Sequence, residues 1–320
     1  MTMNNQNEAS VTVFAPATVA NLGPGFDILG LAIEGAGDEV TARRVSGATG
    51  VVIASIEGDG GVLPLDAASN TAGIAAAHVL KMAGVEARVE LSIVKGMPMG
   101  SGMGSSAASA AAAAVATNLL VGSPLRKTAL VEACVEAEAA VSGRHADNVA
   151  PAVLGGLIMV RRVEPLELIR LPVPDGLTVA VVTPHFELPT RQARAALPEA
   201  VSMGVMVRTM ANVAAIVSAC HTGDLALLGR SIHDEIVTPA RAALIPGGQA
   251  AMDAALDAGA LGSSISGAGP SIFALCRSPR SAQKAADAMI RAFKAAGLTC
   301  RPAIVSPAEC SGARMISGTI

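Results

Sequence analysis

A glycine-rich segment at residues 95–109, KGMPMGSGMGSSAAS, holds the residues of this chain that are best suited to chemistry. It has glycine at 100, 102 and 104, followed directly by the hydroxyl residues Ser105 and Ser106. Glycine backbone can approach an anion closely, and the free N–H groups at the start of a following helix favour negative charge. One serine hydroxyl could also ligate Mg²⁺, which prefers oxygen ligands. The segment predicts a phosphate-binding loop; the alternative is a flexible loop that caps an Ala-rich helix.

Two common phosphate motifs do not match this loop. A Walker A loop needs Lys before the hydroxyl residue, and no Lys occupies that place. A dinucleotide-binding fingerprint G-x-G-x-x-G needs a third glycine where Ser105 stands. The loop therefore indicates another class of phosphate site.

A strand and a helix must position the loop. Residues 87–94 alternate between apolar and polar side chains, which predicts a strand, and residues 105–121 and 125–142 predict two helices. Further strands are expected at 11–14, 38–45, 51–56, 157–163, 177–183, 271–276 and 300–305, further helices at 70–83, 190–196, 199–220, 223–235, 248–258 and 281–296, and loops at 144–156 and 262–271. This mixture excludes all-α and all-β classes. We expect two domains, at residues 11–165 and 166–320.

Composition excludes several kinds of partner. The 320 residues include no Trp, no Tyr and five Phe, so no aromatic platform for nucleic acid is available. The net charge of −3 gives no general attraction to nucleic acid or acidic membranes. Five scattered cysteines indicate buried reduced thiols. The polar start, MTMNNQNEAS, lacks signal-peptide features, and the apolar run 107–121 is shorter than the ~20 residues of a membrane span. We expect a cytoplasmic protein.

Four segments resemble one family, the GHMP kinases. Pro98, Gly100 and residues 102–107 (GMGSSA) fit its second motif, P-x-x-x-G-x-G-S-S-A. Residues 15–31 (APATVANLGPGFDILGL) are similar to its first motif as found in homoserine kinases, and residues 265–271 (ISGAGPS) to its third. Residues 145–156 (HADNVAPAVLGG) are also typical of homoserine kinases. The four segments occur in family order over most of the chain.

The resemblance implies a kinase that uses ATP to phosphorylate the side-chain hydroxyl of L-homoserine, giving O-phospho-L-homoserine on the route to threonine. It implies an α+β fold of two domains, one like ribosomal protein S5 domain 2 and a C-terminal ferredoxin-like domain, with the active site between them. Members are often homodimers. Two alternatives stay open: another small-molecule kinase of the family, acting on mevalonate, a sugar or shikimate, or a catalytically silent relative that binds a metabolite.

The resemblance also implies which residues hold ATP and Mg²⁺. The nucleotide would contact Pro98, Met99, Gly100, Ser101, Gly102, Met103, Gly104, Ser105, Ser106 and Ala107, with Gly267 and Gly269 passing close to this loop. Ser106 and Glu138 would ligate Mg²⁺, although Glu138 could belong to a solvated helix face. Lys95 would lie near the phosphates and Asn70 near adenine. A surface lysine at a strand end and an Asn that caps a helix are the alternatives.

The substrate residues follow from the same resemblance. Arg194 and Arg241 match positions that bind the homoserine carboxylate, for which a guanidinium is well suited. Surface arginines, or Arg191 in place of Arg194, are the alternatives. The ammonium and hydroxyl groups would be surrounded by Asn21, Asp27, His145 and Asn148. We expect catalysis to involve Asp27, Asn148 and Arg194. An Asp with an ordinary pKa near 3.9 is a poor base for an alcohol, which favours positioning of the substrate over proton abstraction.

Overall fold

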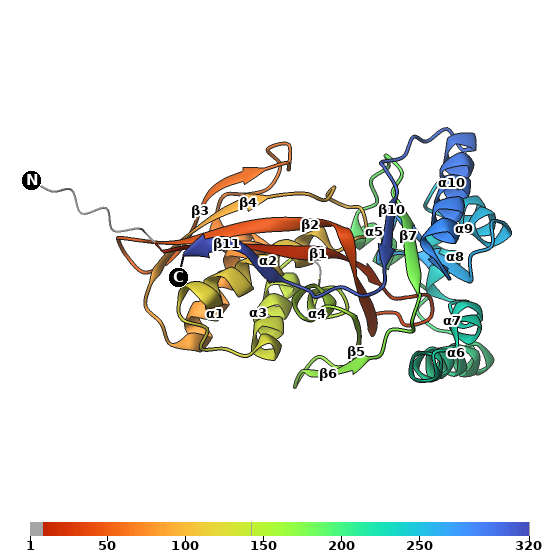
Figure 1. Cartoon of the computed structure of the whole chain (residues 1–320), viewed down its shortest axis with the longest axis horizontal. Coiled ribbons are helices and arrows are strands. Elements are labelled where there is room, and N and C mark those ends of the chain that lie inside the picture. Colours follow the sequence, from red (N-terminus) through yellow and green to blue (C-terminus); the bar gives the residue numbers. More distant parts are fainter. Residues whose placement is uncertain (1–8, 142, 320) are drawn as a thin grey trace, which may run out of the picture.

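Two β-sheets organise the chain, each with helices packed against it (Figure 1). The computed structural model describes residues 9–141 and 143–319. Two sequence predictions fall outside the described residues. They concern most of the N-terminal segment without signal-peptide features (residues 1–8) and the expected helix end at residue 142.

The first sheet has seven strands. Five of them follow the order β11 (Arg314–Thr319), β1 (Ser10–Ala20), β2 (Leu29–Val45), β4 (Arg88–Val94) and β3 (Gly50–Glu57). Strand β5 (Leu157–Arg162) pairs with β2, and β6 (Glu167–Leu171) pairs with β5. All pairs are antiparallel except β3 with β4. Strand β1 therefore lies between β2 and β11, which is the last strand of the described chain. It leads directly into the turn at residues 21–28, the central part of the first motif.

Helices cover one face of this sheet: η1 (Ala67–Ser69), α1 (Thr71–Ala83), α2 (Ser105–Leu120), α3 (Lys127–Ala139) and α4 (Val149–Leu154) (Figure 1). Fourteen of the sixteen residues of α2 are buried. Its run of alanines from 107 to 114, interrupted by one serine, has small side chains, so α2 can lie closely between the sheet and α1 and α3. The apolar run 107–121 is thus a buried core helix, as the sequence predicts.

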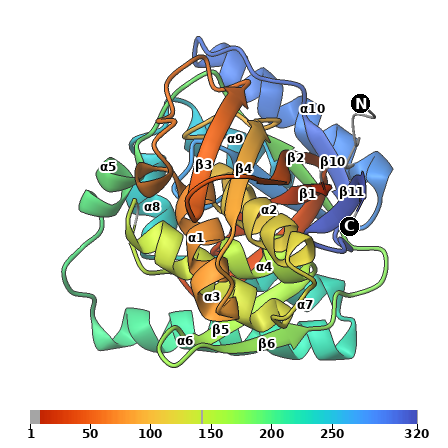
Figure 2. The ribbon, with the colours of Figure 1, turned by 90° about the vertical axis from the view of Figure 1, so that its left-hand side faces the viewer.

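The second sheet has the order β10 (Ile304–Pro307), β7 (Thr178–Val182), β9 (Ile272–Cys276) and β8 (Gly262–Ile265), and all its pairs are antiparallel. Helices α9 (Gly248–Asp257) and α10 (Pro279–Ala295) pack on it around Phe293 and Met289. The remaining helices are α5 (Thr190–Ala195), α6 (Met203–Thr222), α7 (Leu225–Ser231) and α8 (Val237–Ala242) (Figure 2).

Several elements differ from the sequence predictions. The expected loops at 144–156 and 262–271 contain α4 and β8, and β6 and β11 were not predicted. The expected helix at 223–235 ends at Ser231, because the Asp234 carboxylate accepts hydrogen bonds from the backbone N–H groups of Ile236 and Thr238 and starts α8. The domain division at 165/166 stays a prediction, and two strands from beyond it, β6 and β11, lie in the first sheet.

One helix in the described part of the chain, α6, is long and apolar enough by composition to cross a membrane, and little of its apolar stretch is buried. The five cysteines are free thiols, four of them buried and Cys300 partly exposed. Burial raises the pKa of the Cys276 and Cys310 thiols to about 11, consistent with the predicted inert, reduced cysteines.

Candidate active site

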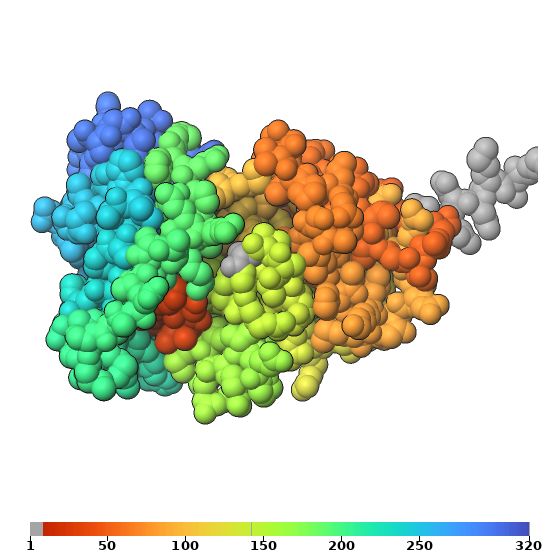
Figure 3. All heavy atoms as spheres, turned by 180° about the vertical axis from the view of Figure 1, so that it is seen from behind, coloured from red at the N-terminus to blue at the C-terminus, as the bar shows by residue number. Residues whose placement is uncertain are grey.

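A cavity lies where the two sheets and their helices meet. Figure 3 shows the molecular surface hollowed between the N-terminal and C-terminal halves of the chain. Of the residues predicted to form the site, the cavity is lined by Asn21, Asp27, Asn70, Lys95, Met99, Gly100, Ser101, Gly102, Gly104, Ser105, Ser106, Glu138, His145, Asn148, Arg194, Arg241 and Gly267. Four others, Pro98, Met103, Ala107 and Gly269, are not among its lining residues. Met103 and Ala107 are buried behind it, so a direct nucleotide contact is wrong for these two side chains.

The glycine-rich loop needs glycine at two positions where another segment of the chain lies directly against it. Gly102 and Gly104 have φ angles of 77° and 69°, which side chains rarely adopt. A Cβ atom at Gly102 would lie 2.4 Å from the carbonyl oxygen of Ser266, and one at Gly104 would lie 2.2 Å from Thr18 Oγ1. The third motif therefore packs on the loop, as the sequence predicts, and the hydroxyl of Ser266 donates to the Gly102 carbonyl at 2.8 Å.

Two features of this loop fit a phosphate group. Within the described residues, the buried hydroxyl oxygens of Ser101 and Ser105 have no hydrogen-bond partner. The first turn of α2 follows Gly104, and no side chain caps its N–H groups. Uncapped helix N–H groups and buried hydroxyls supply donors and a positive dipole end to an anion. This arrangement favours the phosphate-loop prediction over a flexible cap.

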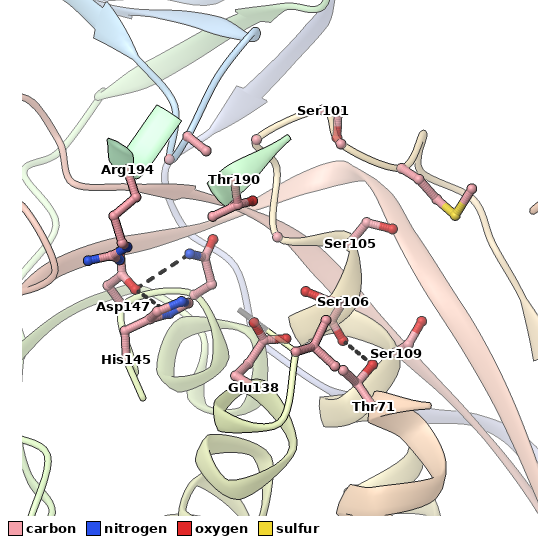
Figure 4. A pocket seen from close by; sticks show the side chains of 18 of the residues that line it. Thr71, Ser101, Ser105, Ser106, Ser109, Glu138, His145, Asp147, Thr190 and Arg194 are labelled. Atoms are coloured by element: carbon pink, nitrogen blue, oxygen red, sulfur yellow. Dashed lines mark hydrogen bonds and ion pairs between the residues drawn. The ribbon is translucent and has the colours of Figure 1, made fainter. Parts of the chain in front are cut away.

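A carboxylate faces the same helix start. Glu138 projects from α3 into the cavity near the end of α2 that carries Ser106 (Figure 4). It is 2% exposed, so the solvated-face alternative for Glu138 is wrong, whereas Glu132 on the same helix is exposed. A hydroxyl and a carboxylate are ligands that suit Mg²⁺, which often takes only a few ligands from the protein. No group of three or more His, Cys, Asp or Glu gathers as a metal site in the described chain.

Lys95 lies beneath the loop in a buried network. Its ammonium group forms an ion pair with Asp38 and donates to Ser109 Oγ at 2.7 Å and to the Ser105 carbonyl at 2.9 Å. The Asp38 carboxylate also accepts from Ser109 Oγ and from the N–H of Gly96. Burial lowers the pKa of Lys95, and the charge of Asp38 offsets only part of that effect. The surface-lysine alternative is wrong, and the network ties the loop entrance to the first turn of α2.

Asn70 caps a helix, which was the alternative to its predicted position near adenine. Its side-chain oxygen accepts from the N–H of Ala72 and caps α1, and its amide group donates to the carbonyl of Pro64 at 3.1 Å. The residue is 5% exposed at the cavity edge. Its contact to adenine stays a prediction.

Two arginines and Phe26 form the opposite end of the cavity. Arg194, from α5, makes a double hydrogen bond with the Asp27 carboxylate at 3.0 and 3.1 Å. The guanidinium carbons of Arg194 and Arg241 lie 5.2 and 5.1 Å from the centre of the Phe26 ring, close enough for cation–π attraction. Arg191, the alternative to Arg194, is exposed and does not line the cavity. The first motif and the C-terminal half therefore meet through Asp27 and Phe26.

Arg241 is a buried cation held by neutral partners. It is 2% exposed, and its guanidinium donates to the carbonyl of Gly267 at 2.6 Å and to that of Ala193 at 3.5 Å. Burial and the nearby charge of Arg194 lower its pKa. No carboxylate forms a salt bridge with it among the described residues. An anionic group bound beside Arg241 would therefore be strongly favoured.

The first motif holds its polar side chains on strained backbone. Asn21 and Asp27 have φ angles of 73° and 59°, in the left-handed region that Asn and Asp tolerate better than most residues. Asn21 connects two motifs, because its amide group donates to the carbonyl of Gly267 at 3.0 Å and its oxygen accepts from the N–H of Asp27 at 3.2 Å. Such strain is typical of functional sites.

The HADN segment adds a titratable pair. His145 Nδ1 lies 3.4 Å from Asp147 Oδ1. Burial lowers the pKa of His145, but the hydrogen bond and charge of Asp147 outweigh it, so the pKa lies above its usual value. The side-chain oxygen of Asn148 accepts from Thr18 Oγ1 at 2.7 Å, which places Asn148 against the first motif.

Comparison with known proteins identifies the family. Models of the GHMP kinases N terminal domain and the GHMP kinases C terminal match residues 70–156 and 216–295. The homoserine kinase of Arabidopsis thaliana is 46% identical over 314 residues, covering 96% of this chain and 85% of the relative. The homoserine kinase of Chlorobium phaeobacteroides strain BS1 is 44% identical, and the match covers 96% of this chain and 99% of the relative. The chain belongs to the homoserine kinase family of the GHMP kinases.

A solved structure agrees with this assignment. The crystal structure of homoserine kinase from Cytophaga hutchinsonii superimposes with a TM-score of 0.93 at 44% identity, and 99% of this chain and 100% of that chain are covered. The two-domain GHMP kinase fold that the motifs implied is therefore confirmed, with mixed helices and sheets. As a GHMP kinase, the protein is an ATP-dependent small-molecule kinase.

The structure adds residues of this GHMP kinase site that sequence reasoning missed. Asp147 and Thr190 line the cavity, and Thr18, Asp38 and Ser109 hold parts of it in place. Asp147 stands inside a recognised motif and could have been noticed as a second carboxylate. Asp38 gave no local signal, because it lies in a strand 57 residues before Lys95.

Proposed function

We propose that the enzyme transfers the terminal phosphoryl group of ATP to the side-chain hydroxyl of L-homoserine. The observation that carries the proposal is the buried Arg241, which shares one cavity with the glycine-rich loop and with the carboxylates of Asp27 and Asp147. An amino-acid substrate has a carboxylate that suits Arg241 and Arg194 and an ammonium group that suits the acidic side chains. Mevalonate and sugars have no ammonium group to use that acidic end.

Catalysis in this proposal depends on positioning. The N–H groups of the glycine-rich loop and of the α2 start hold the phosphates, while Arg194 and Arg241 hold the substrate carboxylate. Mg²⁺, when bound at Ser106 and Glu138, would neutralise charge on the phosphates. Asp27 is already bonded to Arg194 through both oxygens, so its carboxylate is better placed to orient the substrate than to take a proton. Phosphoryl transfer through a loose transition state needs little early deprotonation.

The test is ADP release measured with homoserine, serine, threonine, mevalonate and galactose, each at several concentrations. Release with homoserine at a kcat/KM at least tenfold above the others is the expected result. Preferred release with mevalonate or galactose would replace the proposal with another kinase activity. No release with any compound, together with a thermal shift on adding one, would indicate a silent metabolite-binding relative.

Asp27→Asn separates orientation from proton abstraction. The variant keeps the shape of the side chain but loses the charge that attracts an ammonium group. We expect the homoserine KM to rise about tenfold, since one charge-assisted contact contributes roughly 1.5 kcal/mol, with kcat within about threefold. Steady-state kinetics with ATP at saturation measures both. A collapse of kcat at unchanged KM would instead assign Asp27 as the base.

Three further properties belong to this proposal. The enzyme uses Mg²⁺ through Ser106 and Glu138, works in the cytoplasm and forms a homodimer. The donor set at the start of α2 supports the metal, and free cysteines with inert, high-pKa thiols suit a reducing compartment.

A further inference from the structure

Helix α6 has an apolar stripe that its own fold leaves uncovered. Met203, Met206, Val207 and Met210 are between 40% and 69% exposed, and they recur at intervals of three and four residues. Residues at that spacing share one side of a helix. Ala214 and Val217 continue the stripe toward the end of α6 and are exposed and half-buried respectively. We call these six residues the α6 stripe.

The stripe lies opposite the side of α6 that packs on the protein. Only Ile216, Ala219 and Cys220 are buried among the twenty residues of the helix. Met210 and Ala219 are nine positions apart, which at 3.6 residues per turn is about half a turn around the axis. A helix on the surface of a globular protein usually has one apolar side, which faces the core. Helix α6 has two, and the second requires a partner outside this chain.

Charge indicates what kind of partner fits. The stripe contains no ionisable side chain. Arg208 lies away from the stripe, and its guanidinium makes a double hydrogen bond with Glu235 at 2.7 Å for both contacts. A helix that binds a membrane surface usually has several free Lys or Arg residues on its polar side. Helix α6 has no Lys and no other Arg, so a neutral apolar protein surface is the better match.

An identical stripe supplies such a surface. Met210 is near the middle of the stripe, so a two-fold axis beside it makes two copies of α6 antiparallel and brings every apolar residue against another. A 20-residue helix is about 30 Å long and, with its side chains, about 10 Å wide. Contact along that length would bury on the order of 1,000 Å² in total, about the minimum for a specific interface.

We propose that the α6 stripe is the interface between two copies of this chain, which rests on the homodimer proposed above. The helix is also bonded to the segment before α8: besides the Arg208–Glu235 pair, Asn212 donates to the carbonyl of His233 at 2.9 Å. Since α8 carries Arg241, association through the stripe steadies the segment that leads to the substrate end of the cavity.

The test measures the mass of the full chain by light scattering after size exclusion. We expect twice the chain mass of 31.8 kDa for the wild type and the single mass for Met206→Glu/Met210→Glu. The control is Met82→Glu/Leu256→Glu, which changes two apolar residues of similar exposure on α1 and α9 and is expected to stay dimeric. Flotation with neutral phosphatidylcholine vesicles is run on the wild type, and no binding is expected.

Each outcome decides the proposal. A monomeric wild type overturns both the homodimer and the interface, and so does a monomer that floats with vesicles; neither affects the kinase activity, which ADP release measures separately. A dimer that survives the stripe substitutions overturns the interface alone. Should the double Glu variant fail to fold, Met210→Cys decides: oxidation is expected to give a covalent dimer that the wild type does not form, and its absence in a dimeric protein overturns the interface.

Discussion

Glu138→Gln is expected to lower kcat about 10²- to 10³-fold, a loss typical of removing one preorganised charge-stabilising group. The substitution keeps the size of the side chain and removes the charge that the cavity places beside the start of α2. The homoserine KM should change little, because Arg194 and Arg241 lie at the other end of the site. The concentration of Mg²⁺ that gives half-maximal activity should rise. Initial rates at varied Mg²⁺ and fixed ATP measure both effects.

Glu136→Gln is the matched control. It lies two residues away on α3, where its carboxylate pairs with Arg144 at the surface. Its loss should leave kcat within about twofold, since exposed ion pairs contribute about 1 kcal/mol or less to stability. A kcat above roughly one tenth of the wild-type value in Glu138→Gln, with an unchanged Mg²⁺ requirement, would sink the metal-ligand assignment and leave Glu138 a structural role.

Asp38→Asn is expected to lower the free energy of unfolding by about 3–5 kcal/mol, because it leaves the buried Lys95 ammonium without its anionic partner. Asp38 already offsets part of the burial effect on Lys95, so its removal lowers the pKa of Lys95 in the folded state further. Folding then releases a proton from Lys95. The deficit relative to the wild type should therefore shrink as pH rises above 7, up to the pKa that Lys95 has in the wild-type fold, which burial holds below the ordinary lysine value of about 10.4. Urea unfolding at several pH values measures this difference in the free energy of unfolding.

Two variants control this result. Asp38→Asn/Lys95→Met removes both charges and should recover much of the lost stability, because an uncharged pair has no buried ion to desolvate. Glu90→Gln breaks an exposed contact to Arg43 at 3.9 Å and should change the free energy of unfolding by less than about 0.5 kcal/mol. Equal losses for Asp38→Asn and the double variant would show that packing, and not the ion pair, stabilises the loop entrance.

Sequence reasoning was most successful where the chemistry is local along the chain. The glycine-rich segment is the end of one strand, one loop and one helix start in consecutive residues, and the structure has β4 and α2 where the pattern predicts them. The motif marks Gly102 as a position that requires glycine. The physical reason comes from the other half of the chain, since the carbonyl oxygen of Ser266 lies 2.4 Å from the position that a Cβ atom at residue 102 would take.

What could not be predicted depends on distant partners. Asp38 looked like an ordinary polar residue of an alternating strand, and only folding brings it to Lys95. Strand β8, GSSI, has the composition of a loop, and its pairing with β9 makes it a strand. The spacing of apolar residues in α6 predicts a helix, but it does not show which of the two apolar sides packs on the rest of the protein. The burial of Lys95 could not be read from the sequence for a related reason, since a charged residue at a strand end is normally exposed.

The position of β11 has a consequence for synthesis of the protein. It pairs with β1, so the strand that is synthesised first can complete its pairing only with a strand that is synthesised near the end of translation. On the ribosome, β1 and β2 can pair early, but the far edge of β1 keeps unpaired N–H and C=O groups until residues 314–319 emerge. An open strand edge during translation invites association between nascent chains. We therefore infer that the first sheet closes only after the second has been made, which makes early chaperone protection valuable to this enzyme.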